Sequence, residues 1–307
     1  MPVFNGENFL DDAISSVRAQ TFDDLELLVQ DNASTDRTSA IAQDHAAADP
    51  RVKYVRNETN LGAAPNYNLA WERGRGTYFK WLAHDDRIQP GYVAATVAAL
   101  DAAPDAVLAN TVVDYIDSQG KRLGLYATVL QYAGGPRPSE RLAAMILRSH
   151  SVVDFFGMVR RRAMQGSLLH ASFHGADRAF LAQMALRGRL LQLPEPLVQM
   201  REHPGRYTRQ QKTAKARLSW HDARRSRERN LPTLTLYREY AKLVAAEPLD
   251  PAERAACRHV LRRWWFSNWN SIRVAVDLVA VPFPAVVSLA ERVKFRVFGA
   301  APGHFVR

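Results

Sequence analysis

The apolar residues of the first 115 positions alternate between a helical and an extended spacing. Residues 9–17 place apolar side chains on one helical face, whereas residues 25–29 form a short apolar run typical of a buried strand. The pattern predicts helices at 9–17, 39–48, 65–73 and 91–101, and strands at 25–29, 52–55, 78–82 and 106–113. Alternation at this spacing predicts an α/β fold built on a mostly parallel sheet flanked by helices.

The later residues continue the pattern less regularly. It predicts helices at 139–148, 176–187, 207–245 and 251–272, and an extended segment at 190–198. An aromatic group in the last helix is expected to serve helix packing rather than nucleobase stacking; it comprises Trp264, Trp265, Phe266 and Trp269. At the start of the chain, Pro2 and Val3 stand where a first strand would end, so we expect that strand to be truncated.

Composition and charge narrow the class of protein. The hydrophobic fraction is 47% and the charged fraction 23%, which are ordinary values for a folded soluble protein. The single cysteine, Cys257, excludes an internal disulfide framework and a cysteine-built zinc site. The net charge of +10 is uneven, because residues 1–200 carry −2 and residues 201–307 carry +12. This basic third is either a solvated helical surface or a face for an anionic lipid, a nucleic acid or a phosphorylated substrate.

Two further features concern location. The chain opens without the basic and apolar regions of a secretory signal, which favours a cytoplasmic protein. The apolar segment 274–290 is interrupted by Asp277, Pro282 and Pro284, so it is a poor membrane-spanning helix. Two interpretations of this segment stay open: a helix pair buried in the protein, and a segment that lies in a membrane interface.

Acidic residues follow two of the predicted strands. Asp31 ends the first, and the pair Asp85-Asp86 follows the strand at 78–82. Ligands of parallel α/β sheets bind outside the carboxyl ends of the strands. A turn would explain each acid separately, but acids at two strand ends of one sheet favour a shared ligand site.

Four stretches resemble the family 2 glycosyltransferases, which have the GT-A fold of the nucleotide-diphospho-sugar transferase superfamily. They are PVFNGENFLDDAISSVRAQTFDDLELLVQDNASTD, NLGAAPNYNLA, GTYFKWLAHDDRIQPGYV and HGADRAFLAQMALRGRLLQLPEPLVQMREHPG. Each motif alone is weak, but four in order at suitable spacing form a specific signature. The resemblance implies a GT-A domain over 1–205, with a nucleotide-sugar-binding half at 1–115 and an acceptor half at 116–205. A helical basic extension would follow at 206–307.

The resemblance also implies a metal site. Asp86 would be a metal ligand, and Asp85 would either support the metal or contact the ribose of the donor. Carboxylate oxygens suit Mg²⁺ or Mn²⁺, which act as Lewis acids on a diphosphate leaving group. Many relatives carry another acid at the position of Ala83, so the site has one carboxylate fewer here.

Donor-binding residues are implied around this pair. Asp31 would accept hydrogen bonds from the base or the ribose, and Arg201 and His203 would stabilise the leaving diphosphate. Asp36 has two interpretations, a donor ligand and a helix-capping acid. The predicted donor-binding residues are Pro2, Phe4, Asn5, Asp31, Asn60, Gly62, Asn66, Asp85, Arg201 and His203.

Asp177, at the start of the predicted helix 176–187, is the implied general base. Inverting transfer needs a carboxylate that takes the proton of the acceptor hydroxyl as its oxygen attacks the anomeric carbon. An acid in the first turn of a helix also interacts favourably with the helix dipole, and the two roles are compatible.

The favoured interpretation is an inverting, metal-dependent, hexosyltransferase-like enzyme of cell-surface polysaccharide or glycolipid synthesis. Its expected partners are a nucleoside-diphosphate sugar and a saccharide or lipid-linked saccharide acceptor. Its expected place is the cytoplasm, peripheral at the anionic inner face of the cell membrane, and no nucleic-acid partner is expected.

Other classes are weighed against this interpretation. A nucleotidyltransferase is disfavoured because PVFNGENF lacks the Lys and Arg of a phosphate loop. Two alternatives stay open: a non-catalytic family member with a binding role, and a nucleic-acid-binding protein that uses the basic third without a recognisable motif.

Overall fold

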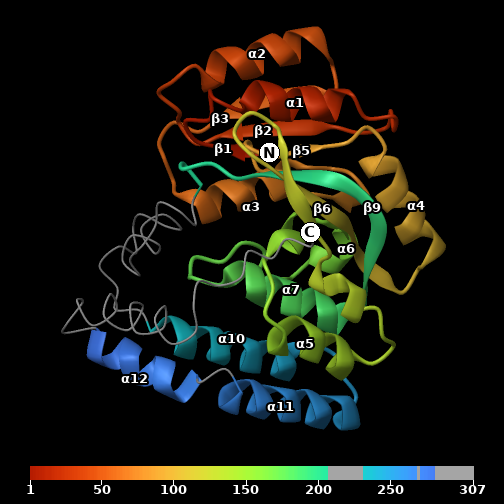
Figure 1. Cartoon of the computed structure of the whole chain (residues 1–307), viewed down its shortest axis with the longest axis vertical. Coiled ribbons are helices and arrows are strands. Elements are labelled where there is room, and N and C mark those ends of the chain that lie inside the picture. Colours follow the sequence, from red (N-terminus) through yellow and green to blue (C-terminus); the bar gives the residue numbers. More distant parts are fainter. Residues whose placement is uncertain (207–230, 268–269, 281–307) are drawn as a thin grey trace.

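Strand pairing in the computed structural model divides the sheet into two parts (Figure 1). The structure describes residues 1–206, 231–267 and 270–280. The first part has three parallel strands in the order β1-β2-β3, with bounds Pro2–Val3, Leu27–Asp31 and Val52–Arg56. The second part has the order β4-β8-β6-β9-β5, with β7 paired to β6. Its strands are β4 (Tyr78–Phe79), β5 (Arg87–Ile88), β6 (Ala106–Ile116), β7 (Arg122–Tyr126), β8 (Met158–Arg160) and β9 (Arg189–Arg201).

Helices flank both parts of the sheet, which confirms the predicted α/β class. In Figure 1, α1 and α2 lie on one side of β1–β3 and α3 lies on the other. The amino-terminal helices are α1 (Leu10–Arg18), α2 (Thr38–Ala48), α3 (Ala63–Arg73) and α4 (Tyr92–Ala102). The later ones are α5 (Pro138–Leu147), α6 (Arg161–Met164), α7 (Ala176–Arg187), α10 (Pro232–Ala246), α11 (Pro251–Phe266) and α12 (Asn270–Ala280), with 3-10 turns η1 (Val129–Tyr132) and η2 (Val153–Phe156).

The prediction of a mostly parallel sheet is correct for β1–β3 and wrong for the second part. There β6 and β9 are parallel, but β4–β8, β5–β9, β6–β7 and β6–β8 pair antiparallel. A parallel pair needs a long crossover, whereas β6 and β7 are joined by the short turn 117–121, which forces them to run antiparallel. The six-stranded part is therefore a mixed sheet.

One predicted strand has the expected short length, and another is longer than predicted. β1 has only two residues, as expected from the sequence, and its buried Pro2 pairs with Gln30 of β2. The extended segment predicted at 190–198 is longer, because β9 covers 13 residues and includes Pro194 and Pro196. The pairing of β9 with β6 shifts register between Thr111 and Val113, next to these prolines, so an irregularity in the ladder accommodates two residues that lack an N–H.

The carboxyl-terminal helices belong to the core of α5 and α7. One hydrophobic cluster contains Leu142 of α5 and Phe180 of α7 together with Val244 of α10 and Leu261 of α11. Of the helix predicted at 207–245, the structure places α10 from Pro232 onward, and residues 207–230 lie outside the described residues.

The predicted aromatic packing group is confirmed for two of its members. Trp264 is buried against Tyr240, with ring centroids 5.6 Å apart, and Trp265 packs on Tyr237 at 4.9 Å. For Phe266 the prediction is wrong, because 80% of this side chain is exposed at the end of α11. Trp269 lies outside the described residues.

The segment 274–290 is described only as far as residue 280, where it forms most of α12. Among the helices of the described ranges, none combines the length and the apolar character needed to cross a membrane.

Candidate active site

The acid pair lies in a short loop between β4 and β5. Asp86 is buried, and its Oδ1 accepts a hydrogen bond from the backbone N of Arg201 at 2.8 Å. β5 pairs with β9 so that Arg87 lies opposite Gln199, which brings the end of β9 to the acid loop. The last residue of β9 therefore fixes the position of Asp86.

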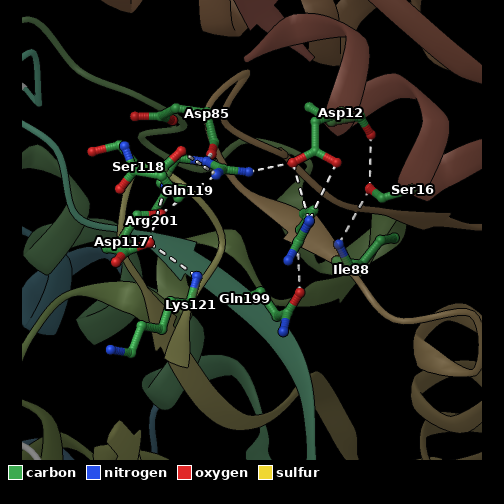
Figure 2. A network of polar contacts seen from close by, with 12 residues as sticks. Asp12, Ser16, Asp85, Ile88, Asp117, Ser118, Gln119, Lys121, Gln199 and Arg201 are labelled. Atoms are coloured by element: carbon green, nitrogen blue, oxygen red, sulfur yellow. Dashed lines mark hydrogen bonds and ion pairs between the residues drawn. The ribbon is translucent and has the colours of Figure 1, made fainter. Parts of the chain in front are cut away.

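The side chain of Arg201 anchors the same loop from inside the protein (Figure 2). Its Nε donates to the backbone O of Asp85 at 2.9 Å, and its Nη2 donates to the carboxylate of Asp12 in α1. Its Nη1 donates to the backbone O of Asp117 and Ser118 in the β6–β7 turn, at 3.4 and 3.1 Å. The side chain is 3% exposed and makes these contacts within the protein, so Arg201 supports the acid loop. Its contact with the donor stays a prediction.

His203 holds the other acid of the pair. Its Nε2 lies 2.9 Å from Oδ2 of Asp85, and its ring packs on Phe9 with centroids 4.7 Å apart. The guanidinium of Arg201 lies 4.7 Å from the centroid of the same Phe9 ring. Burial alone would raise the pKa of Asp85, but the hydrogen bond with His203 and the charge of His84 hold it below its usual range.

Asp86 has the opposite electrostatic environment. Burial and the negative charge of Asp85 raise the pKa of Asp86, against the charges of Arg206 and the buried Lys80. A bound divalent cation would favour the charged form of both acids. The hard carboxylate oxygens of the pair therefore fit Mg²⁺ or Mn²⁺.

Two carboxylates are too few to hold such a cation alone. Within the ranges that the structure describes, no group of three or more His, Cys, Asp or Glu side chains is arranged as a metal site. Mg²⁺ usually keeps several waters and binds through one or two carboxylates together with substrate phosphates. The residues present fit a cation that is shared with a diphosphate.

Arg206 is a basic residue of this site that the sequence analysis missed. Burial alone would lower its pKa, but the charges of Asp86, Glu202 and Asp85 hold the pKa of Arg206 above its ordinary value. The available signal was its place three residues after His203, directly after the last family-like stretch. An arginine beside a carboxylate pair is suited to a phosphate bound across that pair.

The loops after β1 and β2 hold one another. Oδ1 of Asn5, which has a φ of 50°, accepts a hydrogen bond from the backbone N of Thr35 at 2.9 Å. The carboxylate of Asp36 accepts hydrogen bonds from the backbone N of Thr38 at 3.0 Å and of Glu7 at 3.1 Å. Of its two interpretations, this geometry favours the one in which Asp36 supports the start of α2.

Asp31 ends β2 and is fully buried. Its Oδ1 accepts a hydrogen bond from the backbone N of Ser34 at 2.9 Å, and its Oδ2 accepts one from the hydroxyl of Tyr54 at 2.7 Å. Nε of Arg56 lies 3.5 Å from the same Oδ2. Phe4 follows β1 at the same sheet edge and is 44% exposed, and its contact with the donor stays a prediction.

Three predicted donor-binding residues, Asn60, Gly62 and Asn66, belong to an amide network. Asn32 donates to Oδ1 of Asn60 at 2.8 Å and to the backbone O of Gly62 at 3.1 Å. Asn57 donates to Oδ1 of Asn66 at 2.9 Å. Gly62 precedes α3 with a φ of 89°, a conformation that favours glycine. Asn66 is buried inside this network, so it positions α3 on β2.

Asp177 lies in the first turn of α7 and is partly exposed. Its Oδ1 accepts a hydrogen bond from the backbone N of Arg178 at 2.8 Å. Burial and the charges of Asp85, Asp86 and Asp177 together raise the pKa of the Tyr67 hydroxyl. The charges of all three carboxylates thus act on the same hydroxyl, although Asp177 comes from a distant part of the sequence.

Tyr67 connects α3 to the loop before α7. Its ring lies 4.8 Å from the ring of His170, and the next residue, Asn68, exchanges hydrogen bonds with the backbone of His170 at 3.0 and 3.2 Å. The sequence analysis missed Tyr67, whose available signal was its place beside Asn66 in the stretch NLGAAPNYNLA. Tyr67 and Asn68 thus join α3 to the loop before α7, whereas Asp31 lies at the end of β2 and Phe4 directly after β1.

The amino-acid sequence of this chain is similar to those of known proteins. Residues 1–166, more than half of the chain, match glycosyl transferase family 2. The chain is 33% identical over 101 residues to the uncharacterized glycosyltransferase RT0329 of Rickettsia typhi, which covers 33% of this chain and 30% of the relative. It is 24% identical over 178 residues to the GalNAc(5)-diNAcBac-PP-undecaprenol beta-1,3-glucosyltransferase of Campylobacter jejuni. This alignment covers 58% of this chain and 55% of the relative. The matches thus span less than two thirds of these relatives.

Solved structures resemble nearly the whole chain in fold. S. aureus TarS 1–349 in complex with UDP-GlcNAc has a TM-score of 0.62 and 16% identity, with 94% of this chain and 82% of that chain covered. The mannosyltransferase PcManGT from Pyrobaculum calidifontis in complex with GDP-Man and Mn²⁺ has a TM-score of 0.55 and 16% identity, with 99% and 82% covered. These likenesses confirm the predicted GT-A fold.

Proposed function

Since this chain belongs to glycosyl transferase family 2, we propose that it moves a sugar from a nucleoside-diphosphate donor to an acceptor hydroxyl, with inversion at the anomeric carbon. The observation that carries the proposal is that the charges of Asp85, Asp86 and Asp177, which come from two distant segments, act together on the Tyr67 hydroxyl and raise its pKa. Inverting transfer needs a cation site for the leaving diphosphate and, across the reacting carbon, a carboxylate for the incoming hydroxyl.

The residues divide this chemistry between them. Asp86, supported by Asp85, would hold Mg²⁺ or Mn²⁺, and the bound cation would neutralise the charge that develops on the diphosphate. His203 and Arg201 keep the acid loop in place, and Arg206 adds positive charge beside it. Asp177 would take the proton of the acceptor hydroxyl, and the first turn of α7 favours its charged form.

We also propose an acceptor class and a place. The Campylobacter relative is named for a lipid-diphosphate-linked saccharide acceptor, and the last third of this chain carries a charge of +12. A saccharide on an anionic lipid fits both facts, so we place the enzyme in the cytoplasm, peripheral at the inner membrane face, in polysaccharide or glycolipid synthesis.

Calorimetric titration tests the donor site. The protein is titrated with UDP, GDP and dTDP, with and without Mn²⁺, beside Asp86→Ala and the control Asp23→Ala. Asp23 is 99% exposed and lies before β2, at the opposite sheet edge from Asp31. We expect one nucleotide to bind, Mn²⁺ to strengthen its binding about tenfold or more, and only Asp86→Ala to lose that gain. A folded protein that binds none of the three nucleotides would refute the proposal.

The role of Asp177 has a separate test. With the donor sugar identified, Asp177→Asn should bind the nucleotide as the native protein does and should transfer sugar at least about 100-fold more slowly. NMR coupling constants of the product should show the anomeric configuration opposite to that of the donor. Retention of configuration, or full activity of Asp177→Asn, would exclude the inverting mechanism with this base.

A further inference from the structure

The outward face of α11 is basic and ends in an exposed aromatic ring. Arg258, Arg262 and Phe266 follow one another at intervals of four residues, so they form one stripe of the helix. All three are exposed, and Phe266 is 80% exposed. The opposite side of the helix packs into the core through Leu261 and Trp264, which fixes this stripe on the outside.

α12 continues this face with exposed aliphatic side chains. Ile272 is 52% exposed, Leu278 54% and Val279 48%. Arg273 is exposed beside them, as in the neighbouring helix. Single exposed aliphatic residues are common on soluble proteins, whereas several on one short helix favour the interpretation of a contact surface.

The two helices lie together at one end of the molecule. Figure 1 shows α11 and α12 along the end that is farthest from α2 and the parallel strands β1–β3. The only carboxylate in the first turn of α11, that of Glu253, is turned inward and accepts a hydrogen bond from the backbone N of Ser139 at 2.9 Å. This end therefore combines arginine and apolar side chains, and we call the set Arg258, Arg262, Phe266, Ile272, Arg273, Leu278 and Val279 the basic-apolar face.

We propose that the basic-apolar face docks on an anionic lipid bilayer. Arginines are attracted to anionic headgroups, and apolar side chains beside them enter the boundary between headgroups and acyl chains. A nucleic acid would use the arginines but would leave the aliphatic residues without a role, because they have no aromatic plane for base stacking. The docking rests on the proposed function insofar as that function puts the acceptor on a membrane lipid.

Vesicle flotation of the full chain tests the proposal. Vesicles of phosphatidylcholine alone are compared with vesicles of equal parts phosphatidylcholine and phosphatidylglycerol, at low and high salt. We expect flotation with the anionic vesicles, loss of most of it at high salt, and little flotation with phosphatidylcholine alone. The double variants Arg258→Ser/Arg262→Ser and Phe266→Ser/Ile272→Ser should each bind the anionic vesicles about tenfold more weakly.

A matched variant separates this face from the rest of the surface. Leu123 of β7 is 45% exposed, similar to the aliphatic residues of α12, and Leu123→Ser should float as the native protein does. Native-like flotation of both double variants would overturn the proposal, as would absence of flotation in the native protein. A marked fall in Tm of Phe266→Ser/Ile272→Ser would overturn it too, because it would mean that protein covers the face.

Nucleotide titration of the same preparations distinguishes the two proposals. A protein that binds vesicles through this face but binds no nucleotide would refute the proposed transferase while leaving the lipid contact in place. A protein that binds nucleotide and ignores vesicles would refute only the lipid contact. If the arginine variant loses binding to single-stranded RNA and no variant changes flotation, a nucleic-acid surface replaces the lipid surface.

Discussion

Asp12 of α1 binds two arginines that lie beside the acid loop. Its carboxylate accepts hydrogen bonds from the guanidinium of Arg201 and, at 3.1 Å, from Nη1 of Arg87. Arg87 directly follows the acid loop as the first residue of β5, and Arg201 reaches the loop as the last residue of β9. Figure 2 shows the carboxylate of Asp12 beside the guanidinium of Arg201.

Replacing Asp12 should therefore affect nucleotide binding from a distance. We expect Asp12→Asn to destabilise the protein by about 1–3 kcal/mol, because two arginines lose their anionic partner. The gain in nucleotide affinity from Mn²⁺ should fall several-fold, and metal-free nucleotide binding should stay unchanged. The adjacent Asp11→Asn is the control, since Asp11 is 77% exposed and contacts His45 instead. Equal effects of the two variants in calorimetry would contradict this role of Asp12.

Asp154 predicts a pH dependence of stability. Burial raises the pKa of Asp154 to about 7, and its Oδ1 accepts a hydrogen bond from Asn110 at 3.0 Å. Between about pH 4 and pH 7 the native state then binds a proton that the unfolded state has released, so stability falls as pH rises. This group contributes up to about 4 kcal/mol to that fall.

The variant Asp154→Asn removes this titration. We expect it to gain stability over the native protein as pH increases from about 5 to 7, measured by urea unfolding. The exposed control Asp105→Asn should show no such trend, because Asp105 is 64% exposed. A difference between Asp154→Asn and the native protein that is constant with pH would show that Asp154 does not hold a proton in the fold.

The sequence predicts the positions of some residues of the site but not of others. Asp31, Asp85 and Asp86 could be predicted because strand ends and family-like stretches are local features. Asp12 could not, because its partner Arg201 arrives only through the pairing of β5 with β9. The same pairing explains why Arg201 faces the protein interior although its neighbour His203 meets the acid pair.

At the scale of elements, helices were more predictable than strand partners. The spacing predicts a helix at 176–187, and α7 has these bounds. β4 ends at Phe79, earlier than predicted, because Trp81 turns into the core and stacks on Phe155 with centroids 4.6 Å apart. The pairing of β6 with β9 joins distant segments, and no local pattern of apolar residues specifies it.

The junction between α7 and β9 depends on a close approach at Gly188. A Cβ added there would lie 2.7 Å from the backbone O of Asp105 and 2.5 Å from Cγ1 of Val107. We expect Gly188→Ala to destabilise the protein by about 1–3 kcal/mol, because the backbone oxygen cannot move without shifting β6. Thermal unfolding measures this effect.

Gly91→Ala is the matched control. A Cβ at Gly91 meets nothing within 4 Å, and its φ of −86° suits alanine. This variant should change stability by less than about 1 kcal/mol, in the stabilising direction. If Gly188→Ala unfolded at the same temperature as Gly91→Ala, the contact between this junction and β6 would be unimportant.

At the scale of the whole molecule, the helices after residue 206 complete the core. Gln183 and Arg187 of α7 contact the carboxylate of Glu247, at 2.7 and 2.9 Å, where α10 ends. Buried residues of α10 and α11 share one cluster with α5 and α7. Residues on both sides of the predicted boundary at residue 205 therefore contribute to one core.

A chain that ends at residue 206 should consequently lose cooperative folding. It would expose the apolar faces of α5 and α7, so we expect binding of the dye ANS and loss of the near-ultraviolet circular dichroism signal. The full chain should show one sharp thermal transition. A shortened chain with the same transition temperature would mean that the carboxyl-terminal helices are an independent unit.

The hydrogen bond between Asp86 and the backbone of Arg201 joins residues 115 positions apart. A ribosome releases the amino-terminal elements first, and these begin to fold while synthesis continues. β1–β3 and α1–α3 are complete within the first 73 residues, whereas the acid loop lacks its backbone donor until β9 has emerged and paired. We therefore expect the nascent protein to form β1–β3 and α1–α3 early and to complete the acid loop late, so that a half-made chain lacks the finished site.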